Sequence, residues 1–203
     1  VAALRAGQVI AFPTDTVYGL AAHAYLPQAV AQLYALKQRP ADLAVPLLLP
    51  SATAMLGVGD GLPAETWLLA ERFWPGPLTV VLRRSLVVPD VVTNRRPDVA
   101  VRVPDHPLVR QIALRLGAPL ATTSANLHGT PPATTADKVM LTLGDRIPLI
   151  LDGPCNGGVA STVVDLTVVP PSIVRPGPIT AEQIAALIPD VVDGHRAWQV
   201  PLN

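Results

Sequence analysis

The feature that most constrains this chain is an alternation of short apolar runs with longer segments of helical periodicity, separated by prolines and glycines. Short apolar runs between such breakers are typical of buried strands, and apolar residues spaced three and four apart indicate helices. Strands are expected at 7–12, 45–49, 78–84, 98–103, 118–123, 147–151, 161–166 and 172–175. Helices are expected at 27–37, 63–74, 107–117, 135–143 and 180–188. Some successive strands have no helix between them, so the pattern predicts an α/β fold with a mixed sheet.

The length of 203 residues suits one domain. We expect this domain to span 1–188, with 189–203 as an irregular C-terminal tail. The 23 prolines are about twice the usual share and follow no period, so they predict stiff connections between short elements. Asp105 is a candidate N-cap for the helix that Gly117 would end.

Charge and composition exclude several classes of function. The formal net charge is zero, so the molecule lacks the positive field of a general nucleic-acid binder, and any anion site must be local. The single cysteine, Cys155, excludes an intramolecular disulfide and suggests a reducing compartment, so we expect a cytoplasmic protein. No apolar run reaches the roughly 18 residues of a membrane span. The four histidines show no metal-ligand spacing, so we expect no metal held by protein side chains.

The segment "FPTDTVYGL", residues 12–20, places three oxygen-bearing side chains directly after an apolar run. A buried strand has little use for such a series. The segment is therefore either a capped turn or the wall of a polar site, and local rules leave both open.

Two further polar clusters follow apolar elements. In "LKQRP", Lys37 ends a predicted helix and Arg39 precedes Pro40, which favours extended geometry that could bring both cations to one side. The alternative is a basic last turn that complements the helix dipole. In "TTSAN", Ser124 and Asn126 share a side if the chain stays extended, and their donors suit phosphate or ribose oxygens. The alternative there is a turn with local capping.

Arg102 and Arg175 lie within apolar strands, where a charge requires either an internal carboxylate or a bound anion. The loop "GGVAS" leads through Ser161 into another strand and is either a ligand-approach loop or an ordinary connection. Phosphate-binding G-x-x-x-x-G-K-[ST], dinucleotide-binding G-x-G-x-x-G, nucleophile-elbow G-x-S-x-G and zinc-binding H-E-x-x-H motifs are missing from the sequence. Cys155 has no adjacent base that would activate a thiol nucleophile.

Taken together, the motifs resemble those of the YrdC-like threonylcarbamoyl-AMP synthase family. The matching segments, in order, are "FPTDTVYGL", "LKQRP", "FWPGPLTVVL", "VAVRVPDHP", "TTSANLHG", "ASTVVD" and "IVRPGPI". The resemblance implies a strongly twisted mixed sheet flanked by helices, with a basic concave face. It also implies the condensation of L-threonine, bicarbonate or CO2, and ATP to threonylcarbamoyl-AMP and pyrophosphate, for the modification of adenosine 37 in tRNA. The implied partners are the small-molecule substrates and either tRNA or a tRNA-modifying transferase complex, with no membrane.

The resemblance also implies roles for individual residues. Its catalytic and ATP-binding residues would be Lys37, Arg39, Ser124 and Asn126, with Arg175 also at ATP. The residues that bind threonine and its carbamate would be Thr16, Arg102, Thr122 and Ser161, with Thr14 and Tyr18 as neighbours. Mg2+ would bind through the nucleotide phosphates. Asp15 is interpreted as a turn-forming residue, because the implied reaction requires no carboxylate.

Two other functions are consistent with the same motifs. One is an RNA- or tRNA-binding module with weak or lost catalysis, against which the neutral charge argues. The other is a carbamoyl-adenylate domain of the kind used in hydrogenase maturation, which normally belongs to a far longer chain.

Overall fold

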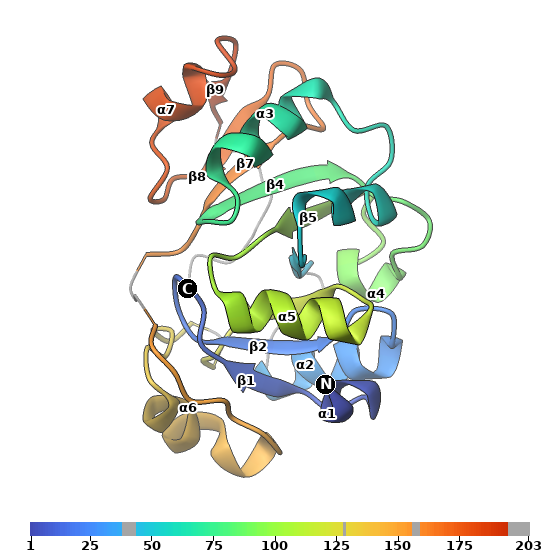
Figure 1. Cartoon of the computed structure of the whole chain (residues 1–203), viewed down its shortest axis with the longest axis vertical. Helices are drawn as coiled ribbons and strands as arrows, with labels where there is room; N and C mark the ends of the chain where they lie inside the picture. Colours follow the sequence, from blue (N-terminus) through green and yellow to red (C-terminus); the bar gives the residue numbers. More distant parts are fainter. Residues whose placement is uncertain (38–43, 128, 156–158, 195–203) are drawn as a thin grey trace.

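The strands form one sheet within residues 1–37, 44–127, 129–155 and 159–194, which are the residues that the computed structural model describes (Figure 1). The strands are β1 (Ile10–Phe12), β2 (Gly19–His23), β3 (Leu47–Leu48), β4 (Leu78–Arg83), β5 (Asp98–Arg102), β6 (Leu120–Ser124), β7 (Thr162–Asp165), β8 (Ser172–Arg175) and β9 (Val192–Asp193). Their order across the sheet is β1-β2-β6-β3-β5-β4-β7-β8-β9. The pairs β3–β5, β4–β7 and β8–β9 are parallel and the other neighbours are antiparallel, which confirms the predicted mixed sheet.

Most helices follow the predicted periodicity. The α-helices are α1 (Ala2–Arg5), α2 (Pro27–Lys37), α3 (Ala64–Phe73), α4 (Asp90–Thr93), α5 (Pro107–Leu116), α6 (Ala136–Leu143) and α7 (Ala181–Ala185), with 3-10 turns η1 (Ala52–Gly57) and η2 (Gly144–Arg146). Gly117 ends α5 with a φ of 74°, a left-handed conformation that glycine adopts without strain. Thr180 and Gln183 form a reciprocal capping box that starts α7.

Some predictions were wrong. The N-cap of α5 is His106 and makes no side-chain cap, so Asp105 does not cap this helix. Residues 147–151 form no strand and contribute only an isolated bridge between Ala11 and Ile150. Within the predicted irregular tail, β9 pairs with β8, so the sheet extends past residue 188, while 195–203 lie outside the described residues.

Side chains alternate between the two faces of the sheet, and this alternation decides where the polar residues point. One face carries the main core, which includes apolar residues of α2 and α3. On the other face, α1 and α5 pack over β1, β2, β3 and β6. A small separate cluster, containing Val81 and Ala100, lies over β4, β5 and β7. Thr79 lies two residues from Val81, and Arg102 lies two residues from Ala100. Their side chains therefore point to the same face as this small cluster, which is the second face of the sheet, between the two apolar regions of that face.

The link between β8 and α7 depends on close backbone packing at Gly177. A Cβ built on Gly177 would lie 2.7 Å from the carbonyl oxygen of Ala160 and would also collide with the backbone of Ser161 and Thr162. Backbone atoms of a paired strand cannot move aside as the end of a flexible side chain can. A side chain at position 177 would therefore displace the start of β7.

We expect Gly177→Ala to lower the free energy of unfolding by about 1–3 kcal/mol, the usual cost of overpacking, in urea denaturation. Gly57→Ala is the matched control, because a Cβ there meets no atom within 4 Å. We expect it to change the free energy of unfolding by less than about 0.5 kcal/mol. Equal effects of the two substitutions would contradict the packing argument.

Candidate active site

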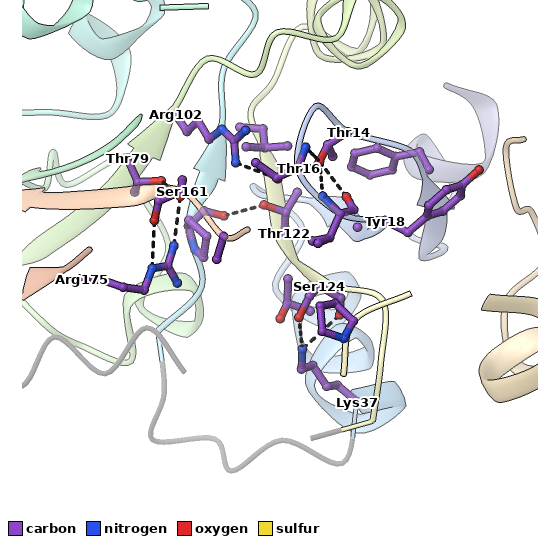
Figure 2. Close-up of a pocket in the computed structure, with 18 residues that line it drawn as sticks. Thr14, Thr16, Tyr18, Lys37, Thr79, Arg102, Thr122, Ser124, Ser161 and Arg175 are labelled. Carbon is purple, nitrogen blue, oxygen red and sulfur yellow. Dashed lines mark hydrogen bonds between the residues drawn. The ribbon is translucent and has the colours of Figure 1, made fainter. Parts of the chain in front are cut away.

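A cavity of about 170 Å³ opens on the second face of the sheet, where the polar residues predicted from sequence come together (Figure 2). Its wall is built from the turn between β1 and β2, the ends of α2 and β6, and residues of β4, β5 and β8. The predicted site residues that line it are Thr14, Thr16, Tyr18, Lys37, Arg102, Thr122, Ser124, Ser161 and Arg175. Arg39 and the glycines at 157 and 158 lie outside the described residues.

The turn after β1 is both a capped turn and a wall of the cavity. The Thr14 hydroxyl donates to the Val17 carbonyl at 2.6 Å and accepts from the backbone N–H groups of Thr16 and Val17. The two threonine hydroxyls are 3.0 Å apart. Thr14 thus shapes the turn, and both Thr14 and Thr16 line the cavity.

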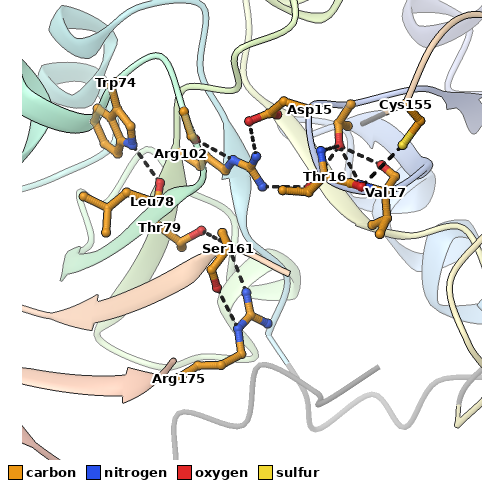
Figure 3. Close-up of polar contacts among 12 residues, drawn as sticks. Asp15, Thr16, Val17, Trp74, Leu78, Thr79, Arg102, Cys155, Ser161 and Arg175 are labelled. Carbon is orange, nitrogen blue, oxygen red and sulfur yellow. Dashed lines mark hydrogen bonds and ion pairs between the residues drawn. The ribbon is translucent and has the colours of Figure 1, made fainter. Parts of the chain in front are cut away.

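Arg102 finds its counter-ion in Asp15, which sequence reasoning had taken for a turn-former (Figure 3). The Arg102 Nη2 atom is 2.7 Å from Asp15 Oδ2, and each side chain is 9% exposed. Arg102 also donates from Nε to the Gly76 carbonyl at 3.0 Å and from Nη1 to the Thr16 hydroxyl at 3.1 Å. Burial lowers the pKa of Arg102, and the Asp15 charge opposes that shift. Arg102 is therefore a fixed cation whose charge is balanced.

Lys37 is the last residue of α2 but is buried, at 1% exposure, so it is no surface cap of the helix. Its ammonium donates to the Ser124 carbonyl at 3.0 Å, to the Ser124 hydroxyl at 2.7 Å and to Asn126 Oδ1 at 2.8 Å. The Ser124 hydroxyl in turn donates to Asn126 Oδ1 at 2.6 Å, and the Asn126 amide donates to the Thr130 carbonyl. The Asn126 N–H bonds the Ser124 carbonyl, so the two side chains meet across a turn rather than along an extended chain.

Arg175 has no carboxylate partner among the described residues. Its Nε donates to the Ser161 carbonyl and its Nη2 to the Ser161 hydroxyl, both at 3.0 Å. Burial and the nearby charge of Arg102 lower the pKa of Arg175 to about 10. Both effects oppose the charged form, so an anion bound beside Arg175 would relieve them. Ser161, which is predicted to bind the substrate threonine, and Arg175, which is predicted to bind ATP, are thus joined directly by hydrogen bonds.

Two further residues complete the description of the wall. The Tyr18 ring lines the cavity, but its hydroxyl donates to the Gly153 carbonyl at 2.9 Å and lies 3.4 Å from Asp152 Oδ1. Burial, together with the Asp152 charge, raises the pKa of Tyr18. Thr79, which sequence reasoning missed, lines the cavity and lies 2.7 Å from the Ser161 hydroxyl. Its signal in the sequence is a lone hydroxyl in the strand "LTVVLR".

Comparison with known proteins places this chain in a family. The family profile Sua5/YciO/YrdC, described as "Telomere recombination", matches residues 2–177. The chain belongs to this family. Its resemblance to YrdC-like proteins is thereby confirmed. Threonylcarbamoyl-AMP synthase of Pyrococcus abyssi is 41% identical over 189 residues, which cover 93% of this chain and 56% of the relative. Threonylcarbamoyl-AMP synthase of Vibrio cholerae is 40% identical over 161 residues, covering 76% of this chain and 84% of the relative.

Solved structures of the Sua5/YciO/YrdC family share the fold. The crystal structure of Pyrococcus abyssi Sua5 complexed with L-threonine superposes with a TM-score of 0.89 and 40% identity, covering 93% of this chain and 56% of the other. Escherichia coli YciO shares the fold with a TM-score of 0.78 at 24% identity, covering 90% of this chain and 89% of the other. The chain thus spans just over half of the length of the Pyrococcus abyssi protein.

The described residues contain no group of three or more His, Cys, Asp or Glu side chains that could hold a metal ion. Across those same residues, every helix is too short or too polar to cross a membrane. The described lining of the cavity combines cations, hydroxyls and apolar side chains, with Asp15 behind Arg102. The predicted site residue Asn126 does not line the cavity and reaches it only through its bonds with Lys37 and Ser124.

We expect Arg102→Gln to lower the free energy of unfolding by about 3 kcal/mol, because it leaves the buried Asp15 carboxylate without a counter-ion. The double variant Asp15→Asn/Arg102→Gln should regain most of that loss in a urea denaturation cycle. The matched control is Arg84→Gln, which breaks an ion pair with the exposed Asp90 and should cost less than about 1 kcal/mol. Strict additivity of the Asp15 and Arg102 effects would contradict the pairing.

Proposed function

We propose that this chain is an L-threonylcarbamoyladenylate synthase, which condenses L-threonine, bicarbonate or CO2, and ATP to threonylcarbamoyl-AMP and pyrophosphate. The observation that carries the proposal is one cavity lined by three separately supported cations, Lys37, Arg102 and Arg175. Family members that are 40% identical carry this activity in their names, and one is solved with L-threonine. A polyphosphate is anionic, and an amino acid carries a carboxylate, so a cavity with several cations suits them together.

The chemistry requires alignment and charge neutralisation rather than a protein nucleophile. The threonine amine and bicarbonate give a carbamate and water, and a carbamate oxygen then attacks the α-phosphorus of ATP. The bond from that phosphorus to the bridging oxygen breaks, and pyrophosphate leaves. Preorganised donors around the phosphates stabilise the charge that develops in this step. The described residues that line the cavity include no cysteine, histidine or carboxylate, in keeping with this chemistry.

We assign the amino-acid end of the cavity to Thr16, Arg102, Thr122 and Ser161. The planar Arg102 guanidinium is held by Asp15, Gly76 and Thr16, so it would offer its remaining N–H groups to a carboxylate or carbamate in a fixed direction. Thr14 supports this end through its bond with Thr16.

We assign the nucleotide end to Lys37, Ser124, Asn126 and Arg175, with Arg39 as an expected further contact. The Lys37 ammonium donates to the Ser124 carbonyl and hydroxyl and to the Asn126 side-chain oxygen, and a phosphate oxygen could take the place of one of these acceptors. Arg175, whose pKa is lowered to about 10, would gain from the negative charge of the phosphates.

Three wider statements belong to the same proposal. Mg2+ would enter as part of the MgATP substrate, because the described cavity wall supplies no carboxylate ligand of its own. The adenylate product would serve the modification of adenosine 37 in tRNA, through tRNA or a tRNA-modifying transferase complex. We place the enzyme in the cytoplasm, in keeping with the free Cys155.

The proposal is tested by pyrophosphate release from purified protein. We expect release only when ATP, L-threonine and bicarbonate are all present, together with a product of the mass of threonylcarbamoyl-AMP. The controls are three reactions, each of which lacks one of the three substrates. Folded protein that releases no pyrophosphate when all three substrates are present would contradict the proposed activity.

The two lysines of the chain give a matched pair of substitutions. Lys37→Met removes the buried ammonium but keeps an apolar stem, and we expect it to lower kcat/KM for ATP at least about 100-fold, the usual scale for loss of a preorganised charge donor. Lys138→Met removes an exposed lysine of α6 and should leave kcat/KM unchanged. Unchanged kinetics in Lys37→Met would contradict the nucleotide assignment.

A further inference from the structure

Thr79 is a buried hydroxyl in an otherwise apolar part of β4. Its neighbours Leu78 and Val80 are fully buried, and Thr79 itself is 3% exposed. Val80 pairs with Val101, so the next residues in this antiparallel register, Thr79 and Arg102, lie opposite each other. The strand alternation places both on the face of the sheet that carries the cavity, and both line it (Figure 2).

Thr79, Ser161 and Arg175 form a chain of hydrogen bonds along the cavity wall. The hydroxyl oxygens of Thr79 and Ser161 are 2.7 Å apart, and Arg175 donates to the Ser161 hydroxyl at 3.0 Å. Arginine has no acceptor, so Ser161 must accept in the second bond. One of the two hydroxyl protons then lies in the hydrogen bond between Thr79 and Ser161, and the other remains available to a further acceptor. Since both residues line the cavity, a ligand oxygen is the acceptor this arrangement prepares for.

We propose that Thr79 is a positioning residue for the amino-acid end of the cavity. Arg175 occupies one acceptor site of the Ser161 hydroxyl, and a proton donated by Thr79 occupies the other. The Ser161 proton is then directed to an oxygen of the bound amino acid or its carbamate. This inference rests on the proposed function, because it takes that function's assignment of Ser161 to the amino acid.

The same chain links the two ends of the cavity. Arg175 donates two hydrogen bonds to Ser161, one to its carbonyl and one to its hydroxyl. Thr79 touches this pair only through the hydroxyl and has no contact with Lys37 or Asn126 among the hydrogen bonds of the described residues. Loss of the Thr79 hydroxyl should therefore weaken the binding of the amino acid more than the binding of the nucleotide.

The test compares Thr79→Val, which keeps the shape of the side chain, with Thr79→Ser, which keeps the hydroxyl. We expect Thr79→Val to raise KM for L-threonine roughly 3- to 10-fold, the scale of one oriented hydrogen bond, and to change KM for ATP less than about 2-fold. Thr79→Ser should restore KM for L-threonine to within about 2-fold of the parent. The control is Thr66→Val, because the Thr66 hydroxyl is also fully buried but lies on α3 without a hydrogen-bond partner.

A double-mutant cycle separates positioning from folding. Ser161→Ala should raise KM for L-threonine by itself, and Thr79→Val should add less than about 2-fold in that background, because it acts through Ser161. Titration calorimetry with L-threonine, which needs no turnover, should give the same ratios.

Several outcomes would overturn the inference. They are unchanged KM in Thr79→Val, equal rises in KM for ATP and L-threonine, no rescue by serine, or additive effects in the cycle. Each of these would leave the proposed function in place, since the parent protein would still be active. A parent protein that neither binds L-threonine nor depends on it for pyrophosphate release would overturn both.

Discussion

The ion pair between Asp15 and Arg102 is the interaction on which the site most depends. Two buried charges are tolerated only when their geometry and remaining hydrogen bonds are nearly complete. Arg102 meets part of this condition, because it lies in β5 and bonds both the turn after β1 and the Gly76 carbonyl ahead of β4. Asp15 Oδ1 and Arg102 Nη2 are buried without a hydrogen-bond partner among the described residues. Three segments that are distant in sequence are thus tied at one point beside the cavity. Without the pair, the turn that carries Thr16 would lose its electrostatic attachment to the sheet.

The three cations of the cavity are compensated in different ways, and this difference suggests how two substrates could be told apart. Arg102 has a full counter-charge in Asp15, and Lys37 is held by oxygen atoms of Ser124 and Asn126. Arg175 bonds the neutral carbonyl and hydroxyl oxygens of Ser161 and no carboxylate of the described residues. Positive charge that no described carboxylate balances therefore lies at Arg175. A polyanion gains most there, while a zwitterionic amino acid is suited to the balanced end. A protein of zero net charge can in this way still hold a local anion site.

Sequence patterns predicted much of the fold because strong periodicity survives in the folded chain. The bounds of α2 were predicted correctly, and α5 ends at Gly117 as its glycine indicated. The elements β2 and α4 were missed, because "GLAAH" contains no β-branched or large aromatic side chain and "DVVT" forms only a single helical turn. Residues 147–151 are apolar enough for a strand, yet pair with β1 only through a single bridge, because their partner edge is short.

The sequence by itself determined the family, the mixed α/β class and the identity of most polar residues that line the cavity, because these follow from motifs and local periodicity. Only the tertiary structure decided that Asp15 is the counter-ion of Arg102, that Tyr18 turns its hydroxyl toward Gly153, and that Thr79 belongs to the cavity wall. The physical reason is the same in each case. A local pattern can show that a buried charge or hydroxyl needs a partner, but the choice among partners depends on which distant strands and turns the sheet brings together.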